Sequence, residues 1–549
     1  MTTLWGSKKN DDNNDDAAST EGPEMPRNSG EDSRREPTER DRLLPESNNR
    51  RHGRSDGYLD PDDPAVSPYN LWTVRFARGL TVLFLAISFI WWVLLFVSIF
   101  VSPPGLHTRG SGFTDFAFTT LTTGILLLSL LFFSAPSTAM RACLAVISIL
   151  LLVDLILIVS FSRLRHEEGP PGMASVAWST LMAAYCVGTD RLVTWGKHEE
   201  EERLTGRPET KRTLKEWLAV LIATLFLVIY IVIVVLITGT LILRARDSTL
   251  KMGGKRYMVD GNKYAVHLSC IGEAKPDANG NRQPTILLEA GEEPLEYDFE
   301  HWAYAAWQNG TIDRYCYWDR PGYAFSDDAP SPHSAGMCAD NLAEALARKG
   351  EEGPWIAVSA GYGSLVSRIF SSRHFSQVEG IMMVDPLHED LLHRVGSPTK
   401  GFLIWAQGII SPLGIQRLGG ALFKGRTRED RVYGRNAYQN GKLIKAKLQE
   451  NLVAESLTKS EISNARTIQK LDTPLVIVSS GIDTRRSDQW EKKQRDLTKV
   501  TDNLLSWDVV NKAPHQVWDT YDGRKVMEKR LGQLVKAAMK NRGKMSEEE

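Results

Sequence analysis

The sequence has few cysteines and no surplus of either charge. Five cysteines occur in 549 residues, and 66 lysines and arginines balance 67 aspartates and glutamates. The missing basic surplus argues against nucleic-acid binding. Two cysteines fall in apolar segments, so Cys270, Cys316 and Cys338 remain for a soluble part, enough for one disulfide and too few to indicate a compartment. At this length we expect at least two folded units, with tails.

Aromatic and β-branched residues are scarce in residues 1–70. We predict a disordered tail there, because little apolar surface is available to offset the entropy of ordering. No apolar run marks a signal peptide, and the acidic residues argue against a mitochondrial presequence. Residues 39–44, "ERDRLL", have the spacing of a sorting signal read by cytosolic adaptors, although such hexamers also arise by chance.

Long apolar runs begin at residue 79. Because about 20 helical residues cross the hydrocarbon layer of a bilayer, we predict a transmembrane region over 71–243 with about five spans. The fourth is the least apolar and is rich in small residues, which suit helix packing in lipid. A soluble helical bundle would need polar faces that these segments lack. The expected spans are 79–101, 113–134, 142–161, 172–189 and 217–243.

Basic residues beside the spans predict the orientation. They cluster before the first span and between the fourth and fifth, which places the N-terminus in the cytosol and the C-terminal domain in a lumen or outside the cell. Basic residues at 244–256 are contrary evidence, although large domains translocate largely regardless of charge. Asn309, in Asn-Gly-Thr, is a glycosylation acceptor and favours a lumen. An endosomal, vacuolar or other secretory-pathway membrane is favoured.

Asp154 lies inside the third predicted span. An ionisable residue at that depth is costly and often marks an ion or substrate path. A polar partner on a neighbouring helix is the ordinary alternative. Transport through the spans is therefore one functional interpretation, and it rests on this residue alone.

From residue 256 onward, short apolar runs alternate with helical stretches. Residues 256–272 predict a hairpin with a tight corner at Gly261-Asn262. Five later runs each place an apolar strand before a polar or glycine-rich loop. The pattern predicts a mostly parallel sheet with helices on both faces over 256–540, with ligands beyond the carboxyl ends of the strands. The five runs are 284–292, 312–327, 354–364, 379–390 and 473–483.

Several motifs in order make this part resemble the α/β-hydrolase superfamily. "LLEAG" is similar to the oxyanion loop, "YWDRPGYAFSD" to the strand and turn before the nucleophile elbow, "PWIAVSAGYGS" to the elbow, and "NKAPHQVW" to the segment of the catalytic histidine. The whole chain resembles fungal integral membrane proteins with a hydrolase-like C-terminal half. The expected fold class is an α-helical transmembrane bundle followed by an α/β-hydrolase-like domain with a cap.

The elbow lacks a serine at its tip. The family pattern is Gly-x-Ser-x-Gly on a sharp strand-to-helix turn, and the flanking strand and helix put Gly361 at the nucleophile position. Glycine accepts the backbone conformation but has no oxygen to attack a carbonyl. A shifted register would make Ser359, near the end of the strand, the nucleophile. Ser364, in the first helical turn, is a weaker candidate.

The resemblance implies roles for the other motif residues. His515 matches the general base and Asp483 the carboxylate that orients it, with Asp488 as an alternative. In another reading, His515 and Asp483 activate a water in the space that the missing side chain leaves. A carboxylate pointing into the oxyanion site would oppose a developing negative charge. The oxyanion-like positions are Gly291, Glu292 and Tyr362.

Residues 391–472 lie between two predicted strands and contain an apolar, glycine-rich stretch. They resemble the lid of the family and predict a cap. An apolar cap suits a lipid or another hydrophobic small molecule, and it would serve equally to pack the domain onto its own spans. Residues 541–549 predict a charged tail.

These features together predict a multi-pass membrane protein whose hydrolase-like domain binds a ligand or partner without serine-hydrolase activity. An active ester or lipid hydrolase using Ser359, His515 and Asp483 is the main alternative, and a transport role is the third. The lipid bilayer and a hydrophobic or lipid ligand are the expected partners. No nucleic acid, cofactor or metal is expected, and the oligomeric state is left open.

Overall fold

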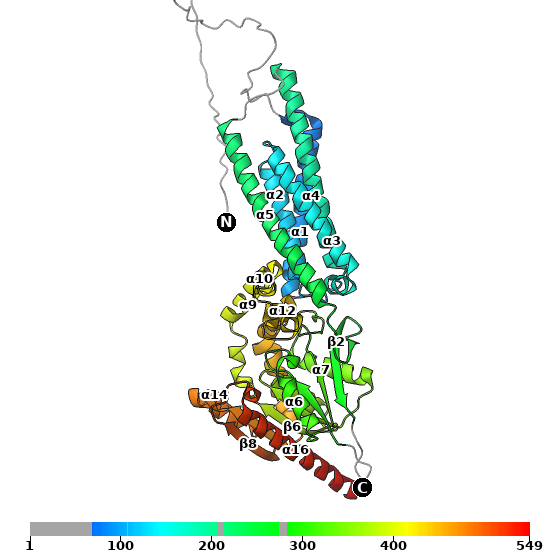
Figure 1. The fold of residues 1–549 in the computed structure, drawn as a ribbon, viewed down its shortest axis with the longest axis vertical. Coiled ribbons are helices and arrows are strands. Elements are labelled where there is room, and N and C mark those ends of the chain that lie inside the picture. The colour runs from blue at the N-terminus through cyan, green and yellow to red at the C-terminus, as the bar shows by residue number, and fades with distance from the viewer. Residues whose placement is uncertain (1–67, 107, 207–212, 274–282, 549) are drawn as a thin grey trace, which may run out of the picture. The chain divides into compact units, whose positions relative to one another are not determined.

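The computed structural model describes residues 68–106, 108–206, 213–273 and 283–548, with side chains as far as residue 542. The predicted tail therefore lies outside the described residues, as does the motif at 39–44; only the short 3-10 helix η2 (Pro68–Asn70) at the end of the tail is described. Residues Tyr58–Glu549 form one compact unit. Its described chain consists of a helical part followed by a part built on a sheet (Figure 1).

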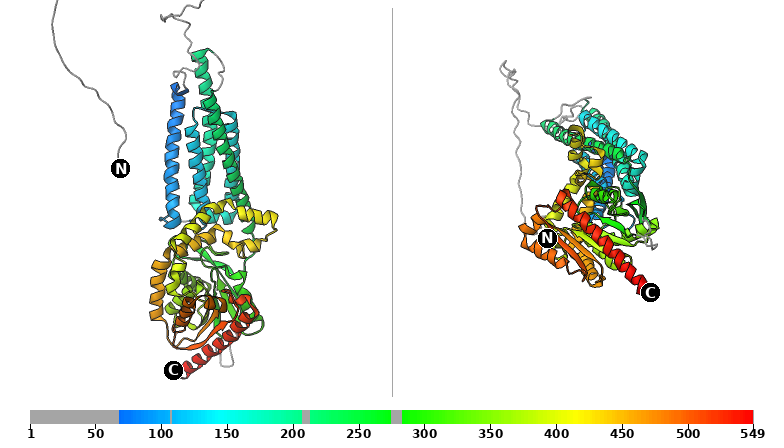
Figure 2. Two further views of the ribbon diagram at one scale, coloured as in Figure 1. Left: turned by 90° about the vertical axis from the view of Figure 1, so that its left-hand side faces the viewer. Right: turned by 60° about the horizontal axis from the view of Figure 1, so that its bottom comes forward.

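Five long helices form the first part and lie side by side (Figures 1 and 2). Each predicted span overlaps one of them. Four of the helices, α1, α2, α3 and α5, are long and apolar enough to cross a membrane. Much of their large apolar surface faces outward, as expected for helices in contact with lipid. The helices are α1 (Trp72–Phe100), α2 (Phe113–Leu131), α3 (Thr138–Ser160), α4 (Ser162–Thr205) and α5 (Leu214–Asp247).

The least apolar predicted span, 172–189, lies within α4. Here α4 contacts its neighbours through small hydroxylated residues: Ser175 Oγ accepts a hydrogen bond from Trp91 Nε1 at 2.9 Å, and the hydroxyls of Ser179 and Thr122 are 2.6 Å apart. Such residues allow close helix packing in lipid. They also lower the hydropathy of α4, which explains why length and composition alone single out four helices.

The second part is built on an eight-stranded sheet with the order β1-β2-β4-β3-β5-β6-β7-β8. β1 and β2 form the predicted hairpin, and β2 pairs antiparallel with β4. All later pairs are parallel, so the expected mostly parallel sheet of an α/β-hydrolase-like domain is confirmed. The strands are β1 (Lys255–Val259), β2 (Tyr264–Gly272), β3 (Thr285–Glu289), β4 (Arg314–Trp318), β5 (Trp355–Ala360), β6 (Val378–Val384), β7 (Leu475–Ser480) and β8 (Leu504–Val510).

Helices cover both faces of this sheet. The apolar core on one face includes residues of α7, α8, α13 and α15, and the core on the other face includes residues of α6 and α16. α16 continues to Glu548, so the expected charged tail from residue 541 is helical as far as the structure describes it. These helices are α6 (Phe299–Gln308), α7 (Ala335–Lys349), α8 (Gly363–Arg373), α13 (Lys459–Ile468), α14 (Gly481–Arg486), α15 (Asp488–Leu497) and α16 (Tyr521–Glu548).

The predicted cap, 391–472, is helical and packs against the bundle. Gly408 of α9 lies directly against the Phe113 ring of α2, and Leu418 of α10 packs on Gly239 of α5. These contacts favour the second interpretation of the cap, in which its apolar helices pack the domain onto its own spans. Its elements are η4 (Glu389–Arg394), α9 (Pro398–Ile410), η5 (Ser411–Leu413), α10 (Ile415–Phe423), α11 (Arg428–Val432), η6 (Ala437–Gln439), α12 (Gly441–Val453) and the π-helical turn η7 (Ala454–Thr458), which continues into α13.

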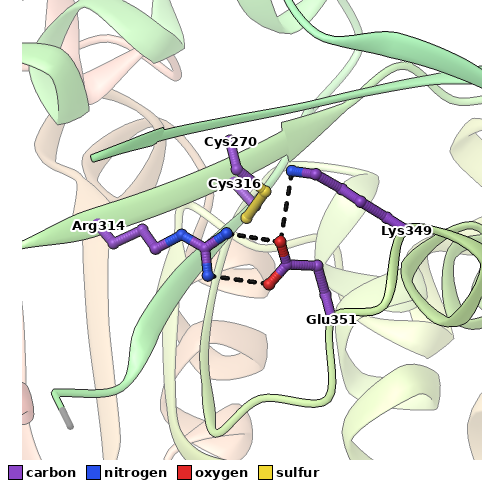
Figure 3. Close-up of a disulfide and its surroundings, with 5 residues drawn as sticks. All are labelled: Cys270, Arg314, Cys316, Lys349 and Glu351. Atoms are coloured by element: carbon purple, nitrogen blue, oxygen red, sulfur yellow. Dashed lines mark hydrogen bonds and ion pairs between the residues drawn. A yellow bond between two sulfur atoms is a disulfide. The ribbon is translucent and has the colours of Figure 1, made fainter. Parts of the chain in front are cut away.

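A disulfide joins the two neighbouring antiparallel strands β2 and β4. Cys270 and Cys316 face each other in the register, with Cα atoms 4.0 Å apart. Figure 3 shows Glu351 beside this bond, where its carboxylate binds the Arg314 guanidinium and lies 3.5 Å from Lys349 Nζ. The single disulfide that three cysteines permit is therefore formed. It joins β2, which contains His267, to β4, which directly precedes Asp319.

Candidate functional site

The elbow has the backbone that the sequence predicts. β5 ends at Ala360, Gly361 has a φ of +45°, and α8 begins at Gly363. A side chain at Gly363 would collide with the carbonyl oxygen of Ala290, so strand and helix approach each other only because this position is glycine. Gly361 therefore lies at the buried tip of the turn, where the sequence predicts the nucleophile position.

A carboxylate fills the space above that tip. A Cβ atom built on Gly361 would lie 2.5 and 2.7 Å from the two carboxylate oxygens of Glu292. Oε1 of Glu292 accepts a hydrogen bond from the Tyr362 N–H at 3.1 Å, and Oε2 lies 3.1 Å from His515 Nε2. The Glu292 carboxylate thus lies over Gly361 and accepts the Tyr362 N–H, at the positions where the sequence predicts the nucleophile and an oxyanion donor.

The histidine of this site is held by an aspartate that sequence reasoning did not choose. His515 Nδ1 lies 2.6 Å from Asp385 Oδ2. The other oxygen, Asp385 Oδ1, accepts hydrogen bonds from the Ser480 N–H at 3.0 Å and from Trp490 Nε1 at 3.1 Å. Asp385 is fully buried immediately after β6, with a φ of +41°. Three donors therefore converge on one carboxylate at the carboxyl end of a central strand.

The hydrogen bond expected from Asp483 is thus made by Asp385, and this is a correction. Asp483 lies in α14, because the chain turns into a helix directly after β7, where Ser480 Oγ caps the Asp483 N–H at 3.1 Å. A carboxylate oxygen of Asp483 lies within 4.8 Å of both His515 and Asp385, yet no hydrogen bond joins it to the imidazole. Asp488, the alternative, starts α15 and makes no bond to His515 among the described residues.

The charges of Glu292 and His515 stabilise each other. Burial alone raises the pKa of Glu292, but the His515 charge and the hydrogen bonds from His515 and Tyr362 outweigh it and lower the pKa to about 2. Burial lowers the pKa of His515, but Glu292 and Asp385 outweigh this effect and hold the pKa well above 6.5. The two carboxyl groups beside His515 therefore favour the charged form of its imidazole.

The remaining predicted site residues lie away from this ion pair or support its loop. Ser359 is fully buried within β5, and its Oγ has no hydrogen-bond partner. Ser364 Oγ donates to the Gly361 carbonyl at 2.7 Å. The Gly291 carbonyl accepts from Nη2 of Arg320 at 2.6 Å. No hydrogen bond in the described chain links either serine to His515.

Arg320 is the second residue that sequence reasoning missed. It is 1% exposed and donates to Glu289 Oε1, to the Ala290 carbonyl and to the Gly291 carbonyl. These bonds fix the loop that carries Glu292. The signal was present in "YWDRPG", since a buried arginine after a strand needs acceptors and the oxyanion loop lies beside it.

A cavity of about 370 Å³ opens beside His515. Its lining is mainly polar and charged and comes from η4, α14 and α15 rather than from the apolar helices α9 and α10. The lining residues are Arg394, Asp483, Arg486, Ser487, Trp490 and His515.

Two other predicted positions lie outside this cavity. Asp154 is fully buried in the helical bundle, with the Thr238 hydroxyl of α5 beside its carboxyl group. Asp115, near the start of α2, is buried in the same way and was not singled out from the sequence. Asn309 is exposed at the end of α6, where its side chain donates to Glu528 Oε1 at 3.1 Å.

Comparison with curated proteins finds fungal relatives. The chain is 31% identical over 506 residues to an uncharacterized protein of Schizosaccharomyces pombe, covering 86% of this chain and 92% of that protein. It is 26% identical over 385 residues to an uncharacterized vacuolar membrane protein of Saccharomyces cerevisiae, covering 60% of this chain and 59% of the relative. A family model described as a region of unknown function (DUF2417) matches residues 39–270.

Solved structures similar to the chain cover its second half. MGS-M2, an α/β hydrolase from a deep-sea metagenome library, is 12% identical with a TM-score of 0.38, covering 51% of this chain and 96% of that structure. The enol-lactonase from Burkholderia xenovorans is 16% identical with a TM-score of 0.35, covering 51% and 100%. These similarities concern the fold alone.

Proposed function

Since this membrane protein with its α/β-hydrolase-like domain belongs to the family of the Schizosaccharomyces pombe protein, we propose that the domain binds a ligand or partner without hydrolysing it. The observation that carries the proposal is the position of Glu292. Its carboxylate occupies the nucleophile space over Gly361 and engages both the Tyr362 N–H and His515 Nε2. A substrate carbonyl would meet a negative charge where catalysis needs hydrogen-bond donors.

The ion pair between Glu292 and His515 also argues against two mechanisms that need no serine. These are activation of a water by His515 and nucleophilic attack by the Glu292 carboxylate. A general base needs a free lone pair near neutral pH, whereas His515 has a pKa held well above 6.5 by its carboxylate neighbours. A carboxylate nucleophile needs an unengaged oxygen facing the substrate, whereas both oxygens of Glu292 accept hydrogen bonds. The site therefore favours binding over water activation and over covalent catalysis.

The cavity beside His515 indicates the kind of ligand. Two arginines, Arg394 and Arg486, and the Trp490 ring line it, so we expect a small polar molecule or a charged peptide group rather than a lipid chain. The apolar cap supports a different role. α9 and α10 pack on the bundle and leave Phe402 and Leu403 62% exposed and Phe423 87% exposed, a pattern that suits helices resting in a lipid leaflet.

The same proposal places the domain on the lumenal side. α4 packs with the four apolar helices as a fifth crossing, and an odd number of crossings separates the two ends of the chain. The Cys270–Cys316 disulfide suits an oxidising compartment, and the Saccharomyces cerevisiae relative is a vacuolar membrane protein. We expect endoglycosidase to increase the gel mobility of the wild-type chain and to leave Asn309→Gln unchanged. A wild-type chain whose mobility endoglycosidase leaves unchanged would contradict this orientation.

Labelling with a fluorophosphonate probe tests the absence of a serine nucleophile. We expect the full chain in detergent to remain unlabelled and to hydrolyse short esters no faster than His515→Ala. Ser359→Ala is the matched control, because Ser359 is the only elbow-strand hydroxyl that a shifted register would use. Labelling of the wild type that disappears in Ser359→Ala would overturn the proposal and restore the serine-hydrolase reading.

A transport role is the second candidate, since two carboxyl groups, Asp154 and Asp115, are buried in the helical bundle. The transport role is tested by measuring proton flux into vesicles that contain either the wild-type chain or Asp154→Asn. Equal flux in both removes the support for transport.

A further inference from the structure

His267 also lies between two carboxylates, in a cluster separate from that of His515. His267 is in β2, Glu296 is in the 3-10 helix η3 (Leu295–Tyr297), and Asp319 directly follows β4. One ligand atom from each lies within 4.8 Å of the other two. His267 and Asp319 are fully buried, and the Glu296 side chain is 12% exposed. The three residues come from separate segments that the fold brings together.

The backbone fixes the tautomer of this histidine. His267 Nε2 is hydrogen-bonded to the Gly253 carbonyl, and a carbonyl oxygen only accepts, so Nε2 carries the proton. In a neutral ring, Nδ1 then presents a lone pair. That lone pair faces Asp319 Oδ2 at 2.8 Å and Glu296 Oε1 at 3.6 Å. A lone pair and two carboxylates converge on one point, an arrangement that a cation would stabilise.

Three of the four carboxylate oxygens in this cluster lack a hydrogen-bond partner. Both oxygens of Glu296 and Oδ1 of Asp319 are buried without a hydrogen-bond partner. Only Asp319 Oδ2 has a backbone donor, the Phe325 N–H at 3.2 Å. In the described part of the chain, no lysine or arginine forms an ion pair with either carboxylate. Buried carboxylate oxygens are ordinarily satisfied by donors, by a positive charge or by a metal ion.

We propose that His267, Glu296 and Asp319 bind a divalent transition-metal ion of the zinc type. Nδ1 and one oxygen from each carboxylate supply three ligands, and a water completes a tetrahedral set. The nitrogen ligand argues against magnesium and calcium, which prefer oxygen alone. The Nε2–H bond to the Gly253 carbonyl is the outer partner that metal-binding histidines commonly have. The sequence predicted no metal, because these ligands are 29 and 23 residues apart and form no short motif.

This site would join the membrane helices to the domain. Gly253 lies in the short connection between α5 and β1, and Glu296 lies four residues after Glu292. A metal ion there would hold the connection, β2 and the loop that closes the elbow in one arrangement. The inference does not depend on the proposed function, since none of the three ligands belongs to the elbow or forms a hydrogen bond with His515 in the described chain.

The metal content of the purified full chain tests the inference. The chain is loaded with zinc in detergent, freed of unbound ion by gel filtration, and measured by mass spectrometry. We expect about one zinc per chain in the wild type and at least a tenfold lower content in Glu296→Gln. Glu300→Gln is the matched control: Glu300 accepts a hydrogen bond from the Tyr315 hydroxyl and lies outside the cluster, so this variant should retain the zinc.

Thermal unfolding gives a second readout. A chelator should lower the melting temperature of the wild type and of Glu300→Gln and leave Glu296→Gln unchanged. If Glu296→Gln does not elute as a folded species, Asp319→Asn takes its place. If the folded wild type retains no zinc, the inference is overturned, and the Glu296 and Asp319 carboxyl groups share a proton instead. If the wild type and Glu296→Gln retain equal zinc, the assignment of the ligands is overturned.

Discussion

His515 and His267 both lie between carboxylates, but their surroundings differ. Around His515, every oxygen of Asp385 and Glu292 accepts a hydrogen bond from a backbone N–H, an indole or the imidazole. Around His267, three carboxylate oxygens have no donor at all. The first cluster is complete as it stands, and the second has the composition of a site that needs a cation.

The difference shows that an inward hydrogen-bonded carboxylate can complete one histidine cluster, while the other keeps carboxylate oxygens without a donor. The strand, the turn and the histidine at the elbow keep the positions expected for the fold, while one inward carboxylate uses the donors that a substrate would need. The experiments that follow disturb one cluster while leaving the other in place.

The largest effect is expected from Asp385→Ala. This change leaves the Ser480 N–H, Trp490 Nε1 and His515 Nδ1 without their acceptor in a fully buried position, and loss of one partner of a buried charge pair costs about 3–5 kcal/mol. Asp483→Ala, the matched control, removes no hydrogen bond to His515 and should cost less than about 0.5 kcal/mol. Tryptophan fluorescence during urea unfolding measures both. Equal losses of unfolding free energy in the two variants would indicate that Asp483 orients His515.

Removal of the disulfide should affect the His267 cluster more than the elbow. Cys270 and Cys316 clamp β2 and β4, which carry or precede His267 and Asp319. We expect the double alanine variant to lose about 2–4 kcal/mol of stability. Hydrogen exchange should quicken in β2 and β4 and remain unchanged in β5 and β6. Uniform acceleration across the sheet would show that the two clusters are not independent.

A smaller, pH-dependent effect is expected from Glu292→Gln. Because the Glu292 side chain is 49% exposed, solvent screening limits its contribution to about 1 kcal/mol or less. The folded pKa of Glu292 lies below 4.5, so its contribution is present above about pH 4.5 and is lost as the pH falls toward 2. The folded pKa of His515 lies above 6.5, so its contribution is complete below about pH 6.5 and is lost as the pH rises through the folded value.

The stability difference between wild type and Glu292→Gln should therefore be greatest between about pH 4.5 and 6.5 and should decrease on both sides. Unfolding midpoints across this pH series check it, with Glu293→Gln as the control in the same loop. A difference that does not vary with pH would contradict the ion pair.

The sequence predicted the fold well where local patterns decide it. The apolar runs, the β1–β2 hairpin and the alternation of strand and helix identified the bundle and the parallel sheet. β8 was not predicted, because it is the edge strand of the sheet and exposes Leu504 and Leu505, so no buried apolar run marks it.

The site was predictable only in part. Gly361 and His515 follow from local motifs, because a strand, a turn and a helix fix the register. The direction of Glu292 depends on tertiary contacts with Tyr362 and His515, and the choice of Asp385 over Asp483 depends on which strand end lies nearest the imidazole. Asp385 did carry a signal, since it directly follows a buried central strand where parallel sheets place their sites.

The position of Glu292 over Gly361 is tested most directly by adding a hydroxyl group at Gly361. Gly361→Ser adds a hydroxyl at the elbow, but its Cβ would lie 2.5 Å from a Glu292 oxygen. Fluorophosphonate labelling is measured for this variant, for Gly361→Ser with Glu292→Ala, and for Gly361→Ser with Glu293→Ala. We predict strong labelling of the Glu292 double variant alone, because only there are the Tyr362 N–H and His515 free. Equal labelling of all three would contradict the account.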